Sequence, residues 1–209
     1  EIYLDYSLED LPKRFDAMVM ACNRLKNIST SLRPFSRVDQ DYKVSFNIHD
    51  GLDSTILILK HRLKANDKRP ASEVITKYGD LPKVECFPGQ LNQVFMNILA
   101  NAIDALDEFN SNSERSFDEI KANPNQITVK TSIENDNVKI SIADNGKGMS
   151  DEVKAKIFDN LFTTKGVGKG TGLGLAIARQ IIEEKHGGKL SCNSVLCEGT
   201  EFILEIPAS

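Results

Sequence analysis

The chain has 209 residues, of which 40% are hydrophobic and 27% charged, and its formal net charge is −4. The length allows one good-sized domain, or one domain with an attached helical segment, and the composition is typical of a soluble globular protein and not of a disordered or fibrous chain. The acidic balance gives no basic surface for nucleic acid, and no apolar run reaches the roughly 20 residues that span a bilayer.

Residues 7–37 are predicted to form one long helix. Apolar residues recur there at steps of three and four: Leu11, Phe15, Met18, Cys22, Leu25, Ile28 and Leu32. This stripe favours packing against a second helix, and a helix lying on its own domain is the alternative. Pro34 is expected to kink or end the helix. We therefore divide the chain into two parts, residues 1–40 and 41–209.

Residues 41–209 alternate between strand and helix patterns. We expect a strand at 43–48, a helix at 49–63, a strand at 74–79, a turn at 81–86, a helix at 88–109 and a polar loop at 108–126. A hairpin at 127–144, a short helix at 151–159, a helix at 175–188 and a second hairpin at 189–207 follow. This order of helices and largely antiparallel strands indicates an α/β fold, a two-layer α/β sandwich.

Four cysteines are scattered along the chain: Cys22, Cys86, Cys192 and Cys197. No C-x-x-C pair and no His-rich cluster accompanies them. Free thiols in a reducing compartment are therefore favoured over a zinc site or a disulfide framework.

Glycine occupies every second position from Gly166 to Gly174, just before the helix at 175–188. Such a segment is costly in ordering entropy, so something must approach its backbone closely or the backbone must move. A Walker loop is excluded because it needs a Ser or Thr after its Lys, whereas Lys169 is followed by Gly170. A GxGxxG loop is excluded because its last two glycines are three residues apart, and glycines at even-numbered positions alone cannot have that spacing. The remaining interpretation is a mobile glycine strip that ends at a helix N-terminus, where free N–H groups and the helix dipole favour an anion. A plain flexible loop is the alternative.

Three further stretches contain candidate site residues. Asn97 and Asn101 lie one turn apart on one face of the helix at 88–109, where their oxygens could reach a cation such as Mg²⁺, although surface amides are the simpler interpretation. DNGKGM places Asp144 at the end of a strand, which alone is typical of a turn. IFDNLFTTK places Phe158 and Phe162 before the glycines, which alone is typical of core packing.

Together and in this order, these stretches resemble the N, G1, F and G2 boxes of sensor histidine kinases, within the ATPase superfamily shared with gyrase, Hsp90 and MutL. The resemblance extends from about residue 90 to residue 206. It implies a Bergerat-type ATP-binding fold, in which a mixed, mostly antiparallel sheet packs on helices. It also makes residues 1–40 similar to the second helix of a histidine kinase dimerisation module.

The resemblance implies a site for ATP and Mg²⁺. Asp144 would accept a hydrogen bond from the adenine amino group and Thr200 would lie nearby, while Gly146 and Gly148 would let the ring lie close. Asn101 would bind the magnesium that bridges the phosphates, with support from Asn97.

The glycine strip would hold the phosphate tail under a closing lid. Its expected binding residues are Lys165, Lys169, Gly170, Thr171, Gly172, Leu173 and Gly174. Lys165 and Asn97 are also the candidate catalytic residues. One position departs from the family, because Asp104 stands where a basic residue often contacts phosphate.

The resemblance implies an ATP-dependent protein-histidine kinase that does not hydrolyse ATP rapidly. Gyrase-like relatives activate water with a Glu one turn before the magnesium Asn, but here that position is Asn97, whose amide cannot accept a proton at pH 7. The γ-phosphate would pass to a His on a dimerisation helix. His49 is followed by an acid but lacks the rest of an acceptor box, so we expect the acceptor to lie upstream of Glu1.

The implied partners are the acceptor-His helix, a response-regulator receiver domain and a second copy of the full-length protein. A cytoplasmic location is expected for this segment, without nucleic acid or membrane contact, and a membrane anchor elsewhere in the full-length protein is left open. Two other functions also remain open. One is an ATP-sensing module without transfer, and the other is an anti-sigma-type Ser/Thr kinase, which the helix at 7–37 disfavours.

Overall fold

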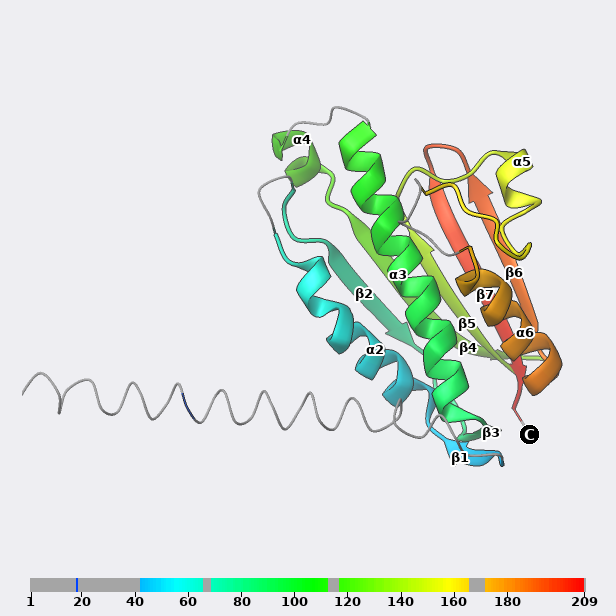
Figure 1. Ribbon diagram of the computed structural model, residues 1–209. Coiled ribbons are helices and arrows are strands. Elements are labelled where there is room, and N and C mark those ends of the chain that lie inside the picture. Colours follow the sequence, from blue (N-terminus) through cyan, green and yellow to red (C-terminus); the bar gives the residue numbers. More distant parts are fainter. Residues whose placement is uncertain (1–17, 19–41, 66–68, 113–116, 166–171, 209) are drawn as a thin grey trace, which may run out of the picture.

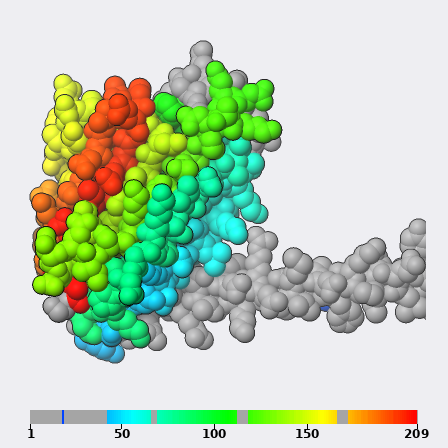
Figure 2. Space-filling view, turned by 180° about the vertical axis from the view of Figure 1, so that it is seen from behind, coloured from blue at the N-terminus to red at the C-terminus, as the bar shows by residue number. Residues whose placement is uncertain are grey.

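The computed structural model describes residue 18 and residues 42–65, 69–112, 117–165 and 172–208. Apart from Met18, the helix expected at 7–37 lies outside the described residues, so the boundary at residue 40 stays a prediction. The remaining residues form a layer of helices that covers one face of a sheet (Figure 1). Seen from behind, the strands themselves form much of the surface (Figure 2). The expected two-layer α/β sandwich is confirmed.

The main sheet has five strands in the order β2-β4-β5-β7-β6. Their bounds are β2 Glu73–Tyr78, β4 Gln126–Glu134, β5 Asn137–Asp144, β6 Lys189–Val195 and β7 Gly199–Pro207. β2 pairs with β4 in parallel, and every other neighbouring pair is antiparallel. Both predicted hairpins, β4–β5 and β6–β7, are therefore present in a mixed, mostly antiparallel sheet.

A second, two-stranded sheet joins β1 (Val44–Phe46) to β3 (Val84–Cys86). The sequence predicted only a turn at 81–86, which was wrong for its last three residues. Val84 and Cys86 are both fully buried and alternate with exposed Glu85, so this segment has the period of a strand. Its partner lies about 40 residues earlier in the chain, where a local pattern gives no signal of the pairing.

Three helical segments form the other layer. They are α2 (Ile48–Leu63), α3 (Pro88–Asn112) and α6 (Gly174–Gln180), which continues as a π-helical turn η1 (Ile181–Lys185). The Asn47 side chain caps α2 by accepting the backbone N–H of His49 at 3.1 Å. α3 lies against α2, α6 and β5 and carries the largest share of the core. Its buried apolar residues are Leu91, Val94, Phe95, Ile98, Leu99, Ala102, Ile103 and Leu106.

Two segments differ from the predicted pattern. The loop expected at 108–126 is partly helical, because α3 continues to Asn112 and α4 (Phe117–Ala122) follows, anchored by buried Ile120. The helix expected at 151–159 is only α5 (Asp151–Lys154), capped by the Ser150 side chain and followed by turns. Ile120 is the buried apolar residue among the α4 side chains that the structure describes, and one such position is too weak a signal for a periodicity argument.

Cys86, Cys192 and Cys197 are free thiols, as expected, and Cys22 lies outside the described residues. None of the helices in the described ranges is both long and apolar enough to cross a membrane.

His186 ties the end of η1 to the beginning of α3. The residue is 4% exposed; ring Nδ1 donates to the Ile181 carbonyl at 2.8 Å, and Nε2 accepts the Phe87 N–H at 3.1 Å. These two bonds require the neutral ring. Burial lowers the pKa of His186 below its ordinary value; the bond to Ile181 opposes this shift, and nearby Lys43 adds to it.

The His186→Gln variant tests this role. At pH 8 it should lower the free energy of unfolding by about 1–3 kcal/mol, because a buried donor and acceptor lose their partners. Below the unfolded-state pKa of about 6.5, the unfolded wild type binds a proton that the folded ring does not, so wild-type stability falls as pH falls. Urea titrations of both proteins from pH 8 to pH 5 should therefore show the gap narrowing. A constant gap would contradict a buried neutral ring.

Candidate functional site

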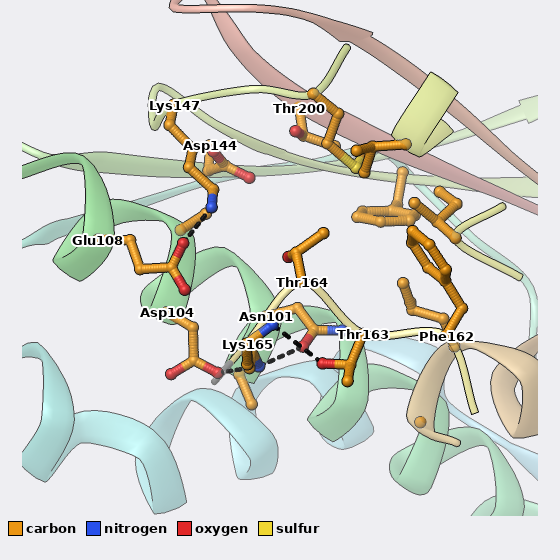
Figure 3. Close-up of a pocket in the computed structure, with 18 of the residues that line it drawn as sticks. Asn101, Asp104, Glu108, Asp144, Lys147, Phe162, Thr163, Thr164, Lys165 and Thr200 are labelled. Atoms are coloured by element: carbon orange, nitrogen blue, oxygen red, sulfur yellow. Dashed lines mark hydrogen bonds and ion pairs between the residues drawn. The ribbon is translucent and has the colours of Figure 1, made fainter. Parts of the chain in front are cut away.

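A cavity of about 400 Å³ opens between α3, the loop after β5 and the residues that precede α6 (Figure 3). Its size lies within the range of small-molecule sites, roughly 300–1,000 Å³. It brings together most of the described residues that the sequence predicted: Asn97, Asn101, Asp144, Gly148, Lys165, Gly172, Gly174 and Thr200. Gly146 and Leu173 do not line it, and Lys169, Gly170 and Thr171 lie outside the described residues.

Asp144 stands at the last position of β5, directly opposite Thr200 of β7. The residue is 8% exposed, and its Oδ1 accepts the Gly146 N–H at 2.9 Å. Burial raises the pKa of Asp144 to about 6, against the opposing effect of the Gly146 and Thr200 backbone N–H groups. At pH 7 this carboxyl is therefore mostly ionised, and its residue lines the cavity.

The glycines after Asp144 let the loop pack closely on the rest of the protein. A Cβ on Gly146 would lie 3.1 Å from the Ala105 backbone of α3, and one on Gly148 would lie 1.9 Å from the Val195 carbonyl oxygen. Gly148 also has a φ of +62°, a region that favours glycine. Backbone packing thus gives a reason for both glycines, and the approach of a ring to them stays a prediction.

One face of α3 forms a wall of the cavity. Asn97, Asn101, Asp104 and Glu108 line it at steps of three and four residues, as one face of a helix requires. Asn97 Nδ2 donates to the Gly174 carbonyl at 2.9 Å and so fixes the first residue of α6 to α3. Asn97 therefore anchors the end of the glycine strip.

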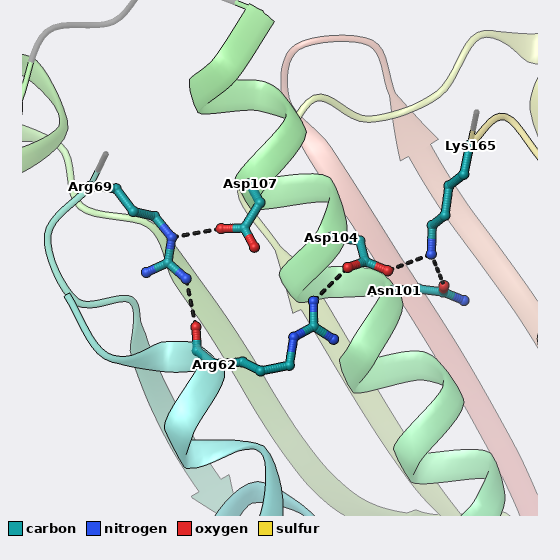
Figure 4. Close-up of polar contacts among 6 residues, drawn as sticks. All are labelled: Arg62, Arg69, Asn101, Asp104, Asp107 and Lys165. Atoms are coloured by element: carbon teal, nitrogen blue, oxygen red, sulfur yellow. Dashed lines mark hydrogen bonds and ion pairs between the residues drawn. The ribbon is translucent and has the colours of Figure 1, made fainter. Parts of the chain in front are cut away.

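Lys165 reaches the same wall. Its Nζ donates to Asn101 Oδ1 at 3.1 Å and pairs with Asp104 Oδ2, while Arg62 of α2 holds Asp104 Oδ1 at 2.5 Å (Figure 4). Burial raises the pKa of Asp104, but the hydrogen bonds and charges of Lys165 and Arg62 outweigh it and hold that pKa below its ordinary value.

A second ion pair lies at the Asp144 end of the cavity. Lys147, between the two glycines of DNGKGM, pairs with Glu108 of α3, and both side chains are half-buried (Figure 3). The sequence analysis missed Glu108, although its spacing of seven after Asn101 places it on the same helix face. It also missed Arg62 and Lys147, whose partners are 42 and 39 residues away.

The phenylalanines ahead of the glycines have different positions. Phe158 packs edge-on against Phe202 with ring centroids 6.4 Å apart, whereas Phe162 lines the cavity. Phe158 is therefore a packing residue, as its simpler interpretation stated.

Within the described ranges, no three or more His, Cys, Asp or Glu residues form a group that could hold a metal ion. The cavity also lacks a histidine from those ranges. His49 instead stacks on Tyr78 at 4.2 Å and bonds Thr131 Oγ1 through Nε2 at 2.9 Å. A cation in the cavity would have to rely on amide or carboxylate oxygens together with oxygens of its ligand.

Comparison with known proteins gives one family. Residues 87–209 match the family model of histidine kinase-, DNA gyrase B- and HSP90-like ATPases. The chain is 38% identical over 128 residues to the sensor kinase CckA of Brucella abortus, which covers 61% of this chain and 13% of CckA. The chain thus spans only a small part of the length of that curated relative.

Solved structures agree with this match. The catalytic domain of histidine kinase ThkA is similar at a TM-score of 0.62 and 27% identity, over 79% of this chain and 95% of that domain. The structure of ThkA in complex with the response regulator protein TrrA covers 96% of this chain and 52% of that chain, at a TM-score of 0.59. Its 22% identity shows a shared fold.

Two glycine substitutions separate close packing from backbone strain. Gly148→Ala should lower the free energy of unfolding by about 2 kcal/mol or more, because it adds a clash with Val195 to a left-handed backbone. Gly187→Ala has nearly the same φ, +66°, but its Cβ would have no neighbour within 4 Å, so it should cost about 1 kcal/mol. Equal losses in urea unfolding would refute the packing role of Gly148.

Proposed function

Because the chain belongs to the histidine kinase-, DNA gyrase B- and HSP90-like ATPase family, as the catalytic domain of a sensor histidine kinase, we propose that this cavity binds Mg-ATP. We further propose that the domain presents the γ-phosphate to a histidine on a helix outside the described residues. The single observation that supports this most is that a buried carboxylate, Asp144, and a cationic group, Lys165, lie in one cavity.

Asp144 suits the adenine end. The amino group of adenine is a hydrogen-bond donor, and a mostly ionised, buried carboxylate is a strong acceptor in a medium that water penetrates little. Gly146 and Thr200 hold the carboxylate through backbone N–H groups, so its orientation is fixed before a ligand arrives. Guanine has no amino group at that position, which makes this contact a source of base selectivity.

The α3 wall suits the phosphate end. Asn101 Oδ1 accepts a hydrogen bond from an ammonium group, so this oxygen is placed where a cation is stabilised. Amide oxygens are suitable ligands for Mg²⁺, which usually retains water and shares phosphate oxygens. When bound, Mg²⁺ would neutralise phosphate charge; Lys165 would contribute a second positive charge, and Asn97 would keep Gly174 beside the wall.

The cavity favours transfer over rapid hydrolysis. Asn97 occupies the position one turn before Asn101, and its amide is engaged by Gly174, so it cannot act as a base toward water. A kinase that waits for an incoming histidine needs a site that holds the triphosphate without activating water. The ThkA structure with TrrA supports a receiver domain as the later phosphate acceptor.

The adenine contact can be tested with an isosteric change. In Asp144→Asn the backbone N–H groups of Gly146 and Thr200 select the amide oxygen, which turns the NH₂ toward the adenine amino group. Calorimetry should show a loss of ATP-analogue affinity of about 100-fold or more, together with loss of preference over the guanine analogue. Asp136→Asn, before the other end of β5, is the matched control and should bind as wild type. Unchanged affinity in Asp144→Asn would remove the basis for the adenine site.

Transfer can be tested with γ-labelled ATP. The chain alone should gain no stable acid-labile label, because His49, His61 and His186 do not line the cavity. Addition of a two-helix module that carries an acceptor histidine should produce label on that module. Label on His49 would contradict the proposed acceptor, and binding without any label on the module would favour an ATP-sensing domain.

A further inference from the structure

The Lys165 ammonium group is held by two oxygens of α3. Asn101 Oδ1 accepts from Nζ at 3.1 Å, and Asp104 Oδ2 forms the ion pair from one turn further along the same helix face (Figure 4). Both oxygens belong to residues that line the cavity. A positive charge therefore already has a two-oxygen site in the wall, one neutral and one anionic.

This pair of oxygens has the chemistry of a magnesium site. Mg²⁺ is usually bound through one or two carboxylates together with substrate phosphates, and Asn101 alone supplies no carboxylate. Asp104 is the carboxylate best placed to complete the set. Of the other carboxylates in the described cavity wall, Glu108 pairs with Lys147, and Asp144 accepts backbone N–H groups at the end of β5.

Arg62 gives Asp104 a defined orientation. It binds Oδ1 at 2.5 Å from the neighbouring helix, which leaves Oδ2 as the oxygen that holds the Lys165 ammonium group together with Asn101 Oδ1. Carboxylates that bind metals are commonly hydrogen-bonded in this way through their second oxygen, and the outer partner fixes the ligand. The side chains of Arg62 and Asp104 are 29% and 32% exposed, so the ion pair is partly screened and its main effect is orientation.

We propose that Asp104 is a second protein ligand of the divalent cation, beside Asn101, and that the Lys165 ammonium occupies the cation position in the nucleotide-free domain. Arg62 is the positioning residue of this site. The arrival of the metal–nucleotide complex displaces Lys165, which then faces the incoming phosphates instead of the wall. This inference rests on the proposed binding of Mg-ATP and adds a carboxylate at the position where the family often has a basic residue.

The test compares nucleotide affinity with and without metal. The probe is the β,γ-imido analogue of ATP, measured by calorimetry in excess Mg²⁺ and in chelator, and the ratio of the two dissociation constants is the readout. Wild type should show a large ratio, and Asp104→Asn should reduce it by about tenfold or more, because a charged ligand is lost. Asp107→Asn removes a carboxylate of α3 that does not line the cavity and should keep the wild-type ratio. Melting curves check that every variant is folded.

Lys165→Met separates the two roles of Asp104. If Asp104 acted only by holding Lys165, both variants would change the ratio equally, and that outcome would overturn the inference. A metal ligand predicts that Lys165→Met keeps the ratio, or raises it, because the competing ammonium is gone. Electron paramagnetic resonance with Mn²⁺ and the same analogue measures metal binding directly, and Asp104→Asn should leave more free Mn²⁺ than wild type.

The possible failures are distinguishable. A wild-type chain that binds no analogue under either condition would refute the proposed function. A wild-type ratio in Asp104→Asn, with analogue binding intact, would refute only the metal ligand.

Discussion

Burial of the apolar face of α3 is the constraint on which the rest of the domain depends. Eight of its side chains are buried against α2, α6 and the sheet, and each of them except Ala102 contributes about 1.5–3 kcal/mol before ordering entropy is subtracted. Once that face is fixed, the helical period places four polar residues of α3 along the cavity: Asn97, Asn101, Asp104 and Glu108. Packing in the core therefore sets the order of polar groups along the cavity.

Two acidic residues of this wall form ion pairs with lysines from the loops around the cavity. Lys165 is held by Asp104 and Lys147 by Glu108, and all four side chains are between 25% and 34% exposed. Pairs this exposed contribute little stability, so they can exchange partners at small cost. An anionic ligand can thus recruit both lysines without leaving a deeply buried charge unpaired. Asp144 differs, because it is held by backbone N–H groups, which cannot turn away as a lysine side chain can.

The sequence predicted those features whose signal is local. The apolar period of α3, the alternation in both hairpins and the position of Asp144 at a strand end are all set within a few residues, and the structure has each of them. Features that depend on distant partners could not be predicted. The pairing of β3 with β1, the parallel contact of β2 with β4, and the ion pair between Arg62 and Asp104 join segments about 40 or more residues apart. No single-sequence pattern specifies which of many charged residues will meet.

The segment between Lys165 and Gly174 shows how these pieces combine. Before the glycines, Lys165 is tied to Asn101 and Asp104; after them, the Gly174 carbonyl is tied to Asn97. Both attachments are made to one face of α3, within two helical turns. The first is an ion pair in which the proposed divalent cation would take the place of the ammonium group, and the second is a hydrogen bond from the Asn97 amide to a backbone carbonyl. Exchange at Lys165 would therefore alter one attachment and leave the other, so cation binding and the position of α6 need not change together.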